Sequence, residues 1–314
     1  MFQKEKKMAK RINIMNLKGG VGKTETALNL AYGLAKNGNR VLYIPLDPQS
    51  DAQENLLPDY DEYVASKYEK VKNCLSQDGY SYSSARLHQA LNAAGYSKER
   101  DYPRTIAELL TEKSMTNSLV MSAVLPTKYE NFWLIPASEG LIGTQQFLFS
   151  VESIRSGEGK ERLKRALDCI DNDFDYVIID NSPFDSILSE NALQASLGPD
   201  GLTIIPVSLS DRSLNGLTRT LGKIVEYVIY DEFDVRHKIL ITMKNRNAVH
   251  KRWGDVFGAE DFSDLVFKTS IRYQSKPVED ATLNGQILLE TKQQNGVKED
   301  YENLLSEIIE YFEN

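Results

Sequence analysis

The 314-residue sequence has little cysteine or histidine and no long apolar run. Its two cysteines, Cys74 and Cys169, are not part of a CxxC pair, which argues against a disulfide framework and a zinc ribbon. The three histidines, His88, His237 and His250, are scattered, so a metal site built from them is not predicted. No apolar run approaches the roughly 20 residues that cross a bilayer, and the charged N-terminal segment lacks the apolar core of a signal peptide. These absences predict a cytoplasmic protein.

An excess of positive charge is also missing. The formal net charge is −8, because 45 Asp and Glu outnumber 37 Lys and Arg, and this total argues against constitutive binding of nucleic acid. Residues 236–252 differ, since they contain basic side chains and no acid. Their lysines and arginines are Arg236, Lys238, Lys244, Arg246, Lys251 and Arg252. This stretch is compatible with a local basic face that binds DNA and also with a solvated rim.

Short apolar runs alternate with amphipathic stretches along most of the chain. The apolar runs predict strands at residues 11–16, 40–46, 131–136, 175–180, 201–207 and 238–243. The amphipathic stretches predict helices at about 23–36, 105–112, 159–171, 213–230 and 296–313. Apolar strands that alternate with helices predict an α/β fold, with a doubly wound, mostly parallel sheet covered by helices on both faces.

With 314 residues and 41% hydrophobic content, the chain could form one large domain or two small ones. We predict a single domain over residues 1–314. Residues 52–104 interrupt the alternation. They are polar, rich in Tyr, Ser, Asp and Lys, and contain helical stretches but no strong strand. We expect them to form a helical insertion packed on the edge of the domain.

Residues 18–24, KGGVGKT, lie between a predicted strand and a predicted helix, which is the context of a phosphate-binding loop. Glycines let the backbone wrap a phosphate closely, and the helix N-terminus faces its negative charge. Lys23 is placed to reach the β- and γ-phosphates of a nucleotide, and Thr24 to bind Mg²⁺. The strict pattern GxxxxGK[ST] fails, because Leu17 stands where its first glycine belongs. The sequence instead has KGGxGK[ST], with a second lysine, Lys18.

This motif resembles the deviant Walker A motif of the ParA/MinD family of P-loop ATPases. Residues 18–50 carry the resemblance, and the DPQ at 47–49 is typical of ParA proteins. Residues 175–196 resemble the family's Walker B strand and the loop after it, and residues 270–286 resemble its late loop and helix. The resemblance covers most of the chain outside 52–104. Because no helix-turn-helix segment precedes the ATPase motifs, the sequence resembles the shorter ParA proteins.

The resemblance implies roles for individual residues. Lys23 and Thr24 match the phosphate-binding lysine and the Mg²⁺-binding hydroxyl. Lys18 matches the signature lysine, which crosses a dimer to the partner's ATP, so hydrolysis is expected to need a nucleotide-sandwich homodimer. Asp47 matches the acid associated with Mg²⁺ and the attacking water, and Asp180 matches the Walker B aspartate.

The implied site can be stated residue by residue. The residues expected to contact ATP are Lys18, Gly19, Gly20, Val21, Gly22, Lys23, Thr24, Glu25 and Asn245, the last because it follows a predicted strand near the family's adenine-reading segment. The expected catalytic residues are Lys18, Lys23 and Asp47, and the expected Mg²⁺ ligands are Thr24, Asp47 and Asp180.

Three departures from the family pattern bear on activity. Pro45 stands where the family usually has an acid, two residues before Asp47, and proline can neither ionise nor donate a backbone hydrogen bond. Glu25 replaces the usual Thr or Ser, and an acid in the first turn of a helix favours the helix dipole. Residues 181–184, Asn-Ser-Pro-Phe, stand where two prolines are common.

The resemblance implies a DNA-partition ATPase that hydrolyses ATP slowly. Such a protein dimerises with ATP, binds DNA nonspecifically, is stimulated by a centromere-binding ParB-type partner, and is cytoplasmic and nucleoid-associated, with no membrane partner. The candidate DNA face is Arg219, Lys223, Lys244, Arg246, Lys251 and Arg252.

Three alternatives remain beside this reading. A MinD-like membrane-associated positioning ATPase ends in a lipid-binding helix, but the predicted helix 296–313 has an acidic polar face, which an anionic membrane repels. An iron–sulfur electron donor is discounted because no cysteine follows Asp180. A nonhydrolytic ATP-gated scaffold stays open because of Pro45.

Overall fold

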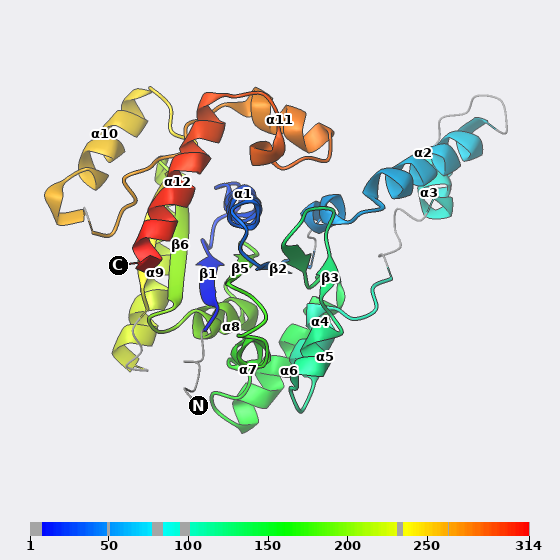
Figure 1. Cartoon of the computed structure of the whole chain (residues 1–314), viewed down its shortest axis with the longest axis horizontal. Helices are drawn as coiled ribbons and strands as arrows, with labels where there is room; N and C mark the ends of the chain where they lie inside the picture. The colour runs from blue at the N-terminus through cyan, green and yellow to red at the C-terminus, as the bar shows by residue number, and fades with distance from the viewer. Residues whose placement is uncertain are drawn as a thin grey trace.

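The computed structural model describes residues 8–48, 51–76, 84–94, 101–230, 235–262 and 264–313. In this part of the chain, seven strands form one sheet in the order β3-β4-β2-β5-β1-β6-β7 (Figure 1). The strands are β1 (Lys10–Ile14), β2 (Val41–Leu46), β3 (Leu125–Pro126), β4 (Phe132–Leu134), β5 (Tyr176–Asn181), β6 (Gly201–Ser208) and β7 (His237–Thr242). Each adjacent pair is parallel except β3–β4.

Burial explains why these segments are strands. Every residue of β2 and β5 is buried, as expected for the centre of a parallel sheet that helices cover on both faces. β1 lies between β5 and β6, so the chain reverses its direction of winding beside β1. The predicted doubly wound, mostly parallel fold is confirmed.

Helices cover both faces of this sheet. Figure 1 shows α1 (Lys23–Lys36), α11 (Ser275–Leu283) and α12 (Gly296–Glu313) on one side. The opposite side carries α4 (Ile106–Thr111), α5 (Asn117–Met121), α6 (Gly140–Ile154), α7 (Arg162–Asp168) and α8 (Ile187–Ala195). A third apolar cluster joins α9 (Asp211–Tyr230) and α10 (Ala248–Phe257) to β6 and β7. Short 3₁₀ helices lie at Asp51–Leu56, Glu260–Phe262 and Leu288–Glu290.

The C-terminal helix α12 packs on α1. Its buried residues include Tyr301, Leu304 and Ile308, and a Cβ added to Gly33 of α1 would lie 2.8 Å from Cδ2 of Leu305. The expected docking on the core is therefore confirmed. The apolar face of α12 is used inside the fold, which removes the lipid-binding surface that a MinD-like helix would present. In the described residues, no helix has both the length and the apolar character needed to cross a membrane.

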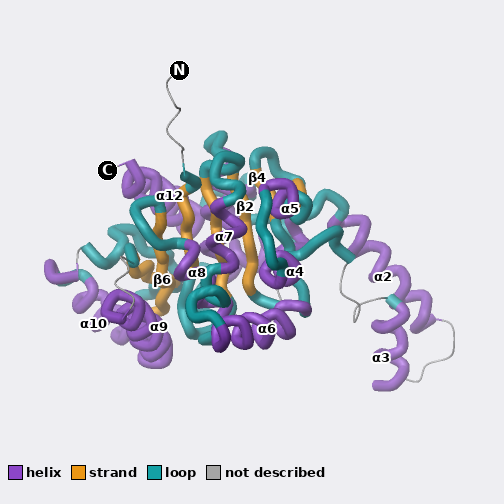
Figure 2. Tube along the Cα trace, turned by 90° about the horizontal axis from the view of Figure 1, so that it is seen from below, coloured by secondary structure: helices purple, strands orange, loops and turns teal. Residues whose placement is uncertain are grey.

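The predicted insertion begins at the body of the protein and then leaves it. Gln53 is buried and exchanges hydrogen bonds with the backbone of Ala137, at 2.7 Å and 3.2 Å. Helices α2 (Tyr60–Ser76) and α3 (Ser84–Ala93) follow and pack against each other. Figures 1 and 2 show these two helices projecting away from the sheet. Packing on the domain edge thus describes the start of the segment and its end, where Tyr102 packs against the main core and donates to Glu54 at 3.0 Å, but it does not describe α2 and α3.

Candidate nucleotide-binding site

The loop between β1 and α1 lies at the carboxyl edge of the sheet, where doubly wound folds bind their ligands. Gly20 and Gly22 have φ angles of +70° and +81°. Residues with a side chain rarely adopt this left-handed backbone, so the loop requires glycine at both positions. Gly22 also precedes α1 without a side-chain capping hydrogen bond. The N–H groups of the first helical turn are therefore available to an anion.

Lys23 is buried at the start of α1, with 7% of its surface exposed. Its Nζ donates to the backbone oxygen of Lys18 at 3.0 Å, which folds the lysine back over the loop. Burial lowers the pKa of Lys23, and the negative charges of Asp180 and Asp47 oppose that shift. The ammonium group therefore lies within electrostatic reach of both predicted Mg²⁺-binding aspartates.

Asp180 is buried near the end of β5. Its Oδ2 accepts a hydrogen bond of 2.9 Å from the Tyr43 hydroxyl on β2, whereas its buried Oδ1 has no hydrogen-bond partner. Burial raises the pKa of Asp180 to about 6, and the neighbouring Thr24 hydroxyl, the hydrogen bond from Tyr43 and the charge of Lys23 oppose the shift. A buried carboxylate oxygen without a partner is costly, and a positive charge at that oxygen would remove the cost.

These donors suit Mg²⁺. The Thr24 hydroxyl, the Asp180 carboxylate and the nearby Asp47 are oxygen groups, and they are too few to form a complete cage. Mg²⁺ prefers such sites, because it keeps several waters and binds through one or two carboxylates together with substrate phosphates. Within the described ranges, no cluster of three or more His, Cys, Asp or Glu side chains offers a competing metal cage.

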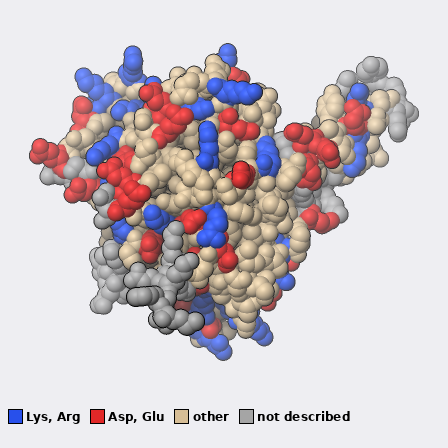
Figure 3. Space-filling view, in the orientation of Figure 1, with Lys and Arg blue, Asp and Glu red and all other residues tan. Residues whose placement is uncertain are grey.

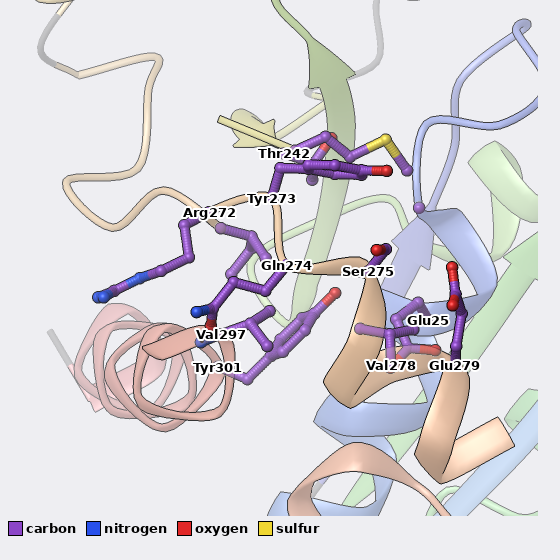
Figure 4. A pocket seen from close by; sticks show the side chains of 13 residues that line it. Glu25, Thr242, Arg272, Tyr273, Gln274, Ser275, Val278, Glu279, Val297 and Tyr301 are labelled. Carbon is purple, nitrogen blue, oxygen red and sulfur yellow. Dashed lines mark hydrogen bonds between the residues drawn. The ribbon is translucent and has the colours of Figure 1, made fainter. Parts of the chain in front are cut away.

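A pocket of about 250 Å³ opens beside the phosphate loop (Figure 4). Gly22 and Glu25 line it from the loop and α1, and Met243 lines it from the end of β7. Figure 4 shows Tyr273 and Tyr301 on opposite sides of the pocket. Met243 has a φ of +51°, and such strained backbone clusters at ligand sites. A largely apolar pocket next to a phosphate site suits a nucleobase and its ribose.

Two residues expected at the nucleotide differ in their placement. Glu25 lines the pocket and accepts a hydrogen bond of 2.7 Å from Asn29, and burial raises the pKa of this carboxyl, a shift that the bond opposes. Asn245 does not line the pocket. Its backbone N–H donates to His250 and its side-chain oxygen accepts from the Asn247 backbone, so it shapes the turn into α10.

The sequence contained a partial signal for the pocket residues that were missed. Residues 270–286 resemble a family segment, but the sequence alone indicates no role for Tyr273 or its neighbours in the pocket. Tyr43 had no signal at all, because an aromatic residue in an apolar strand is most simply a core residue. Only the structure reveals that its hydroxyl meets Asp180.

A family model described as an AAA domain matches residues 9–235, which is more than half of the chain. The chain belongs to this family. Its relatives place it among the ParA/MinD ATPases. The sporulation initiation inhibitor protein Soj of Bacillus subtilis is 30% identical over 217 residues, which cover 69% of this chain and 65% of Soj. The chromosome partitioning protein ParA of Myxococcus xanthus is 29% identical over 208 residues, which cover 66% and 55% of the two chains. The match thus spans less than two thirds of each relative.

Solved structures with this fold cover nearly the whole of the ParA/MinD-type chain. The apo McdA protein of Cyanothece aligns with a TM-score of 0.66 at 22% identity, over 96% of this chain and 99% of McdA. A putative plasmid partition protein of Borrelia burgdorferi bound to AMPPNP aligns with a TM-score of 0.62 at 22% identity, over 97% and 99%. Cobyrinic acid a,c-diamide synthase of Mycobacterium smegmatis, with ADP and magnesium, aligns with a TM-score of 0.64 at 22% identity, over 98% and 96%. At this identity the likeness shows the fold, and the bound molecules are consistent with ATP and Mg²⁺ as cofactors.

The basic residues of this ParA/MinD-type ATPase fall into two groups. Figure 3 shows Lys and Arg side chains over α10, with Asp and Glu side chains beside them. The exposed members of the predicted DNA face are Arg219 on α9 and, around the turn from β7 into α10, Lys244, Arg246, Lys251 and Arg252. Lys223 differs, because its half-buried Nζ lies 2.8 Å from both Asp185 and Glu190. Those two carboxylates neutralise Lys223, so it should be removed from the predicted DNA face.

Proposed function

We propose that this chain is a DNA-partition ATPase that binds Mg²⁺–ATP at the β1–α1 loop and hydrolyses it slowly. The observation that carries the proposal is the unpartnered Oδ1 of buried Asp180 beside Lys23 and Thr24. A glycine turn with only a structural role would not need a buried, unpartnered carboxylate oxygen beside it, because a buried carboxylate lowers stability unless something compensates its charge. The relatives named Soj and ParA support partition as the biological use.

Each residue of the proposed site has a separate role in phosphoryl transfer. Lys23 leaves the Lys18 carbonyl and binds the β- and γ-phosphates, and the N–H groups of the loop and of α1 bind the rest of the chain of phosphates. Asp47 orients the attacking water. Thr24, Asp47 and Asp180 would hold Mg²⁺, which would supply the positive charge that neutralises the phosphates. Catalysis is then a matter of position and electrostatics rather than of a covalent intermediate.

The partition cycle adds a homodimer and DNA to this chemistry. Lys18 is half-buried at the head of the loop, beside exposed Gly19 and Gly20, so the loop opens to solvent. We propose that Lys18 reaches the ATP of a second copy, and that the dimer binds DNA nonspecifically through the residues around α10. A centromere-binding ParB-type protein then stimulates hydrolysis, and the dimer is located on the nucleoid in the cytoplasm.

The Lys18→Ala variant tests the dimer and DNA steps together. We expect wild-type protein to bind nonspecific duplex DNA at low salt with ATP but not with ADP or without nucleotide, and to lose affinity steeply as salt rises. The variant is expected to bind ATP and to lose DNA binding, because it cannot complete the sandwich dimer. Fluorescence anisotropy of a labelled duplex measures both. Equal DNA binding with every nucleotide would contradict the switch, and no DNA binding at all would exclude the partition function.

A two-charge variant tests the DNA face. Replacing Lys251 and Arg252 with alanine is expected to lower DNA affinity and to reduce the slope of log affinity against log salt by about two, since each phosphate contact contributes about one. ATP hydrolysis without DNA should stay at the wild-type rate. The matched control removes Lys70 and Lys72, which are exposed on the projecting helix α2. An equal loss of slope in the control would mean that net charge, rather than this face, governs binding.

A further inference from the structure

Tyr43 is a buried tyrosine whose hydroxyl contacts a carboxylate of the candidate nucleotide-binding site. It lies on β2, fully buried, among apolar neighbours. A buried phenol requires a hydrogen-bond partner, and backbone carbonyls or water usually supply one. The Tyr43 hydroxyl instead donates at 2.9 Å to Oδ2 of Asp180, the carboxylate that lies beside the phosphate-binding lysine.

The geometry of the two strands explains how this contact forms. Tyr43 pairs with Ile178 and Pro45 pairs with Asp180 in the register of β2 and β5. Tyr43 and Pro45 are two residues apart on one strand, so their side chains leave the same face of the sheet. Pro45 lies directly beside Asp180 but can donate no hydrogen bond to it. The hydroxyl of Tyr43, two residues earlier on β2, donates the hydrogen bond to Asp180 instead.

The consequence concerns the other carboxylate oxygen. The terminal torsion of an aspartate is broad, so a carboxylate without fixed partners can turn either oxygen toward a ligand. The bond from Tyr43 fixes Oδ2 and leaves Oδ1, which is buried and has no partner. The ring itself is held by an edge contact with Phe132 on β4, with centroids 6.4 Å apart. The ring of Tyr43 is thus supported by Phe132 while its hydroxyl is directed at Asp180.

We propose that Tyr43 is a positioning residue, which orients Asp180 so that Oδ1 faces the Mg²⁺ that accompanies ATP. The residue touches neither the nucleotide nor the metal and acts only through Asp180. This inference rests on the proposed binding of Mg²⁺–ATP and adds a residue that the ATPase motifs do not contain. Partners that orient a metal-binding carboxylate typically change metal affinity by about 10–100-fold when removed.

The Tyr43→Phe variant removes only the hydroxyl. We expect the Mg²⁺ concentration that half-saturates tight binding of a fluorescent ATP analogue to rise about tenfold. The affinity measured in EDTA should stay within about twofold of wild type, because Tyr43 does not contact the nucleotide. Binding of Mn²⁺ with ATP, followed by the electron paramagnetic resonance of the free ion, should weaken to the same extent.

Tyr129→Phe is the matched control. Tyr129 also donates from a partly buried hydroxyl to a carboxylate, Glu290 at 2.6 Å, and it stacks on the same Phe132. Its removal should cost similar stability and leave the Mg²⁺ dependence unchanged. Thermal unfolding of both variants shows the temperature at which each is folded, and binding is measured below the lower midpoint.

A double variant separates orientation from packing. In an Asp180→Asn background, Tyr43→Phe should cause no further change in Mg²⁺ dependence, because its target carboxylate is absent. If Tyr43→Phe keeps the wild-type Mg²⁺ dependence, the hydroxyl serves packing alone and the inference is wrong. If wild-type protein binds the nucleotide equally in Mg²⁺ and EDTA, the proposed function itself fails, which is a distinct result.

Discussion

Asp180→Asn is expected to reduce ATP hydrolysis by at least about 100-fold, because it removes the charged ligand that holds Mg²⁺ at the phosphates.

The same Asp180→Asn change should alter how the free energy of unfolding depends on pH. Burial raises the pKa of Asp180 to about 6 from 3.8. Between these values the folded protein retains a proton that the unfolded chain has lost, so the free energy of unfolding falls as pH rises. The full amplitude is about 3 kcal/mol.

Urea unfolding of nucleotide-free protein between pH 4 and 8 measures this effect. Wild type should lose stability between about pH 4 and pH 6, and Asp180→Asn should lack that part of the slope. Other titrating groups contribute equally to both proteins, so the difference between the two curves isolates Asp180. Identical curves would mean that water solvates the Asp180 carboxylate in the nucleotide-free state. Its burial would then carry no stability cost for Mg²⁺ to offset.

The stability cost of Asp180 agrees with the site being built for a ligand. Lys23 and Thr24 favour the carboxylate, yet burial still wins and the pKa remains high. Binding of Mg²⁺–ATP would also stabilise the folded protein, since any ligand that binds only the native state raises the free energy of unfolding. A thermal shift with Mg²⁺–ATP that is larger in wild type than in Asp180→Asn is the simplest sign of this coupling.

Much of the fold could be predicted because its central segments are unambiguous. The predicted helices 23–36 and 296–313 coincide with α1 and α12. The five longest strands were predicted within one or two residues, since fully buried apolar runs leave few alternatives. The short β4 was placed within residues 131–136, although only its middle is a strand.

The elements that were missed lack such a pattern. α6 mixes buried Leu141 and Leu148 with exposed Ile142, Phe149 and Ile154, so no apolar stripe marks one face. In α10 only His250 and Phe257 are buried. The antiparallel strand β3 has two residues, which is too short for any periodicity. Helices of this kind depend on tertiary contacts that a single sequence does not display.

The residues of the candidate site likewise include some that the sequence predicts and some that only the structure reveals. The phosphate loop was predicted because its glycines and lysines, between a strand and a helix, follow from the chemistry of phosphate binding. Asp47 and Asp180 were predicted only because the sequence around them resembles the ParA/MinD family. Tyr43 and Gly216 were not predicted, because the role proposed for each depends on close contact between segments far apart in the chain. Lys223 was assigned to the DNA face from charge alone, and its two acidic partners became visible only in three dimensions.

Gly216→Ala is expected to weaken nucleotide binding strongly, although position 216 lies on α9 and far along the chain from the phosphate loop. A Cβ at this position would lie 2.5 Å from Cβ of Lys18 and 2.7 Å from Oδ1 of Asn16. Such contacts are not tolerated, so α9 must move away from the loop. The movement would break the bond from the Leu17 N–H to the Thr220 hydroxyl, now 3.0 Å. Overpacking of this kind costs about 1–3 kcal/mol.

The control for this variant lies on the same helix. Gly222 is exposed, and a Cβ there meets nothing within 4 Å, so Gly222→Ala should stabilise the protein by about 0.5–1 kcal/mol. Urea unfolding and titration with a fluorescent ATP analogue compare the two variants. Wild-type affinity in Gly216→Ala would mean that α9 can shift without disturbing the loop.

The expected contrast follows from where α9 is attached. Thr220 binds the backbone of the phosphate loop, while Lys223, one turn along, binds Asp185 in the loop after Asp180. One helix thus contacts the loop before α1 and the loop after β5, which border the proposed phosphate site, and it carries exposed Arg219. A change that pushes α9 outward should therefore disturb both loops at once. Loss of nucleotide affinity in Gly216→Ala at a temperature where the protein remains folded would establish that α9 supports the site, whereas lower stability with wild-type affinity would indicate a purely structural role.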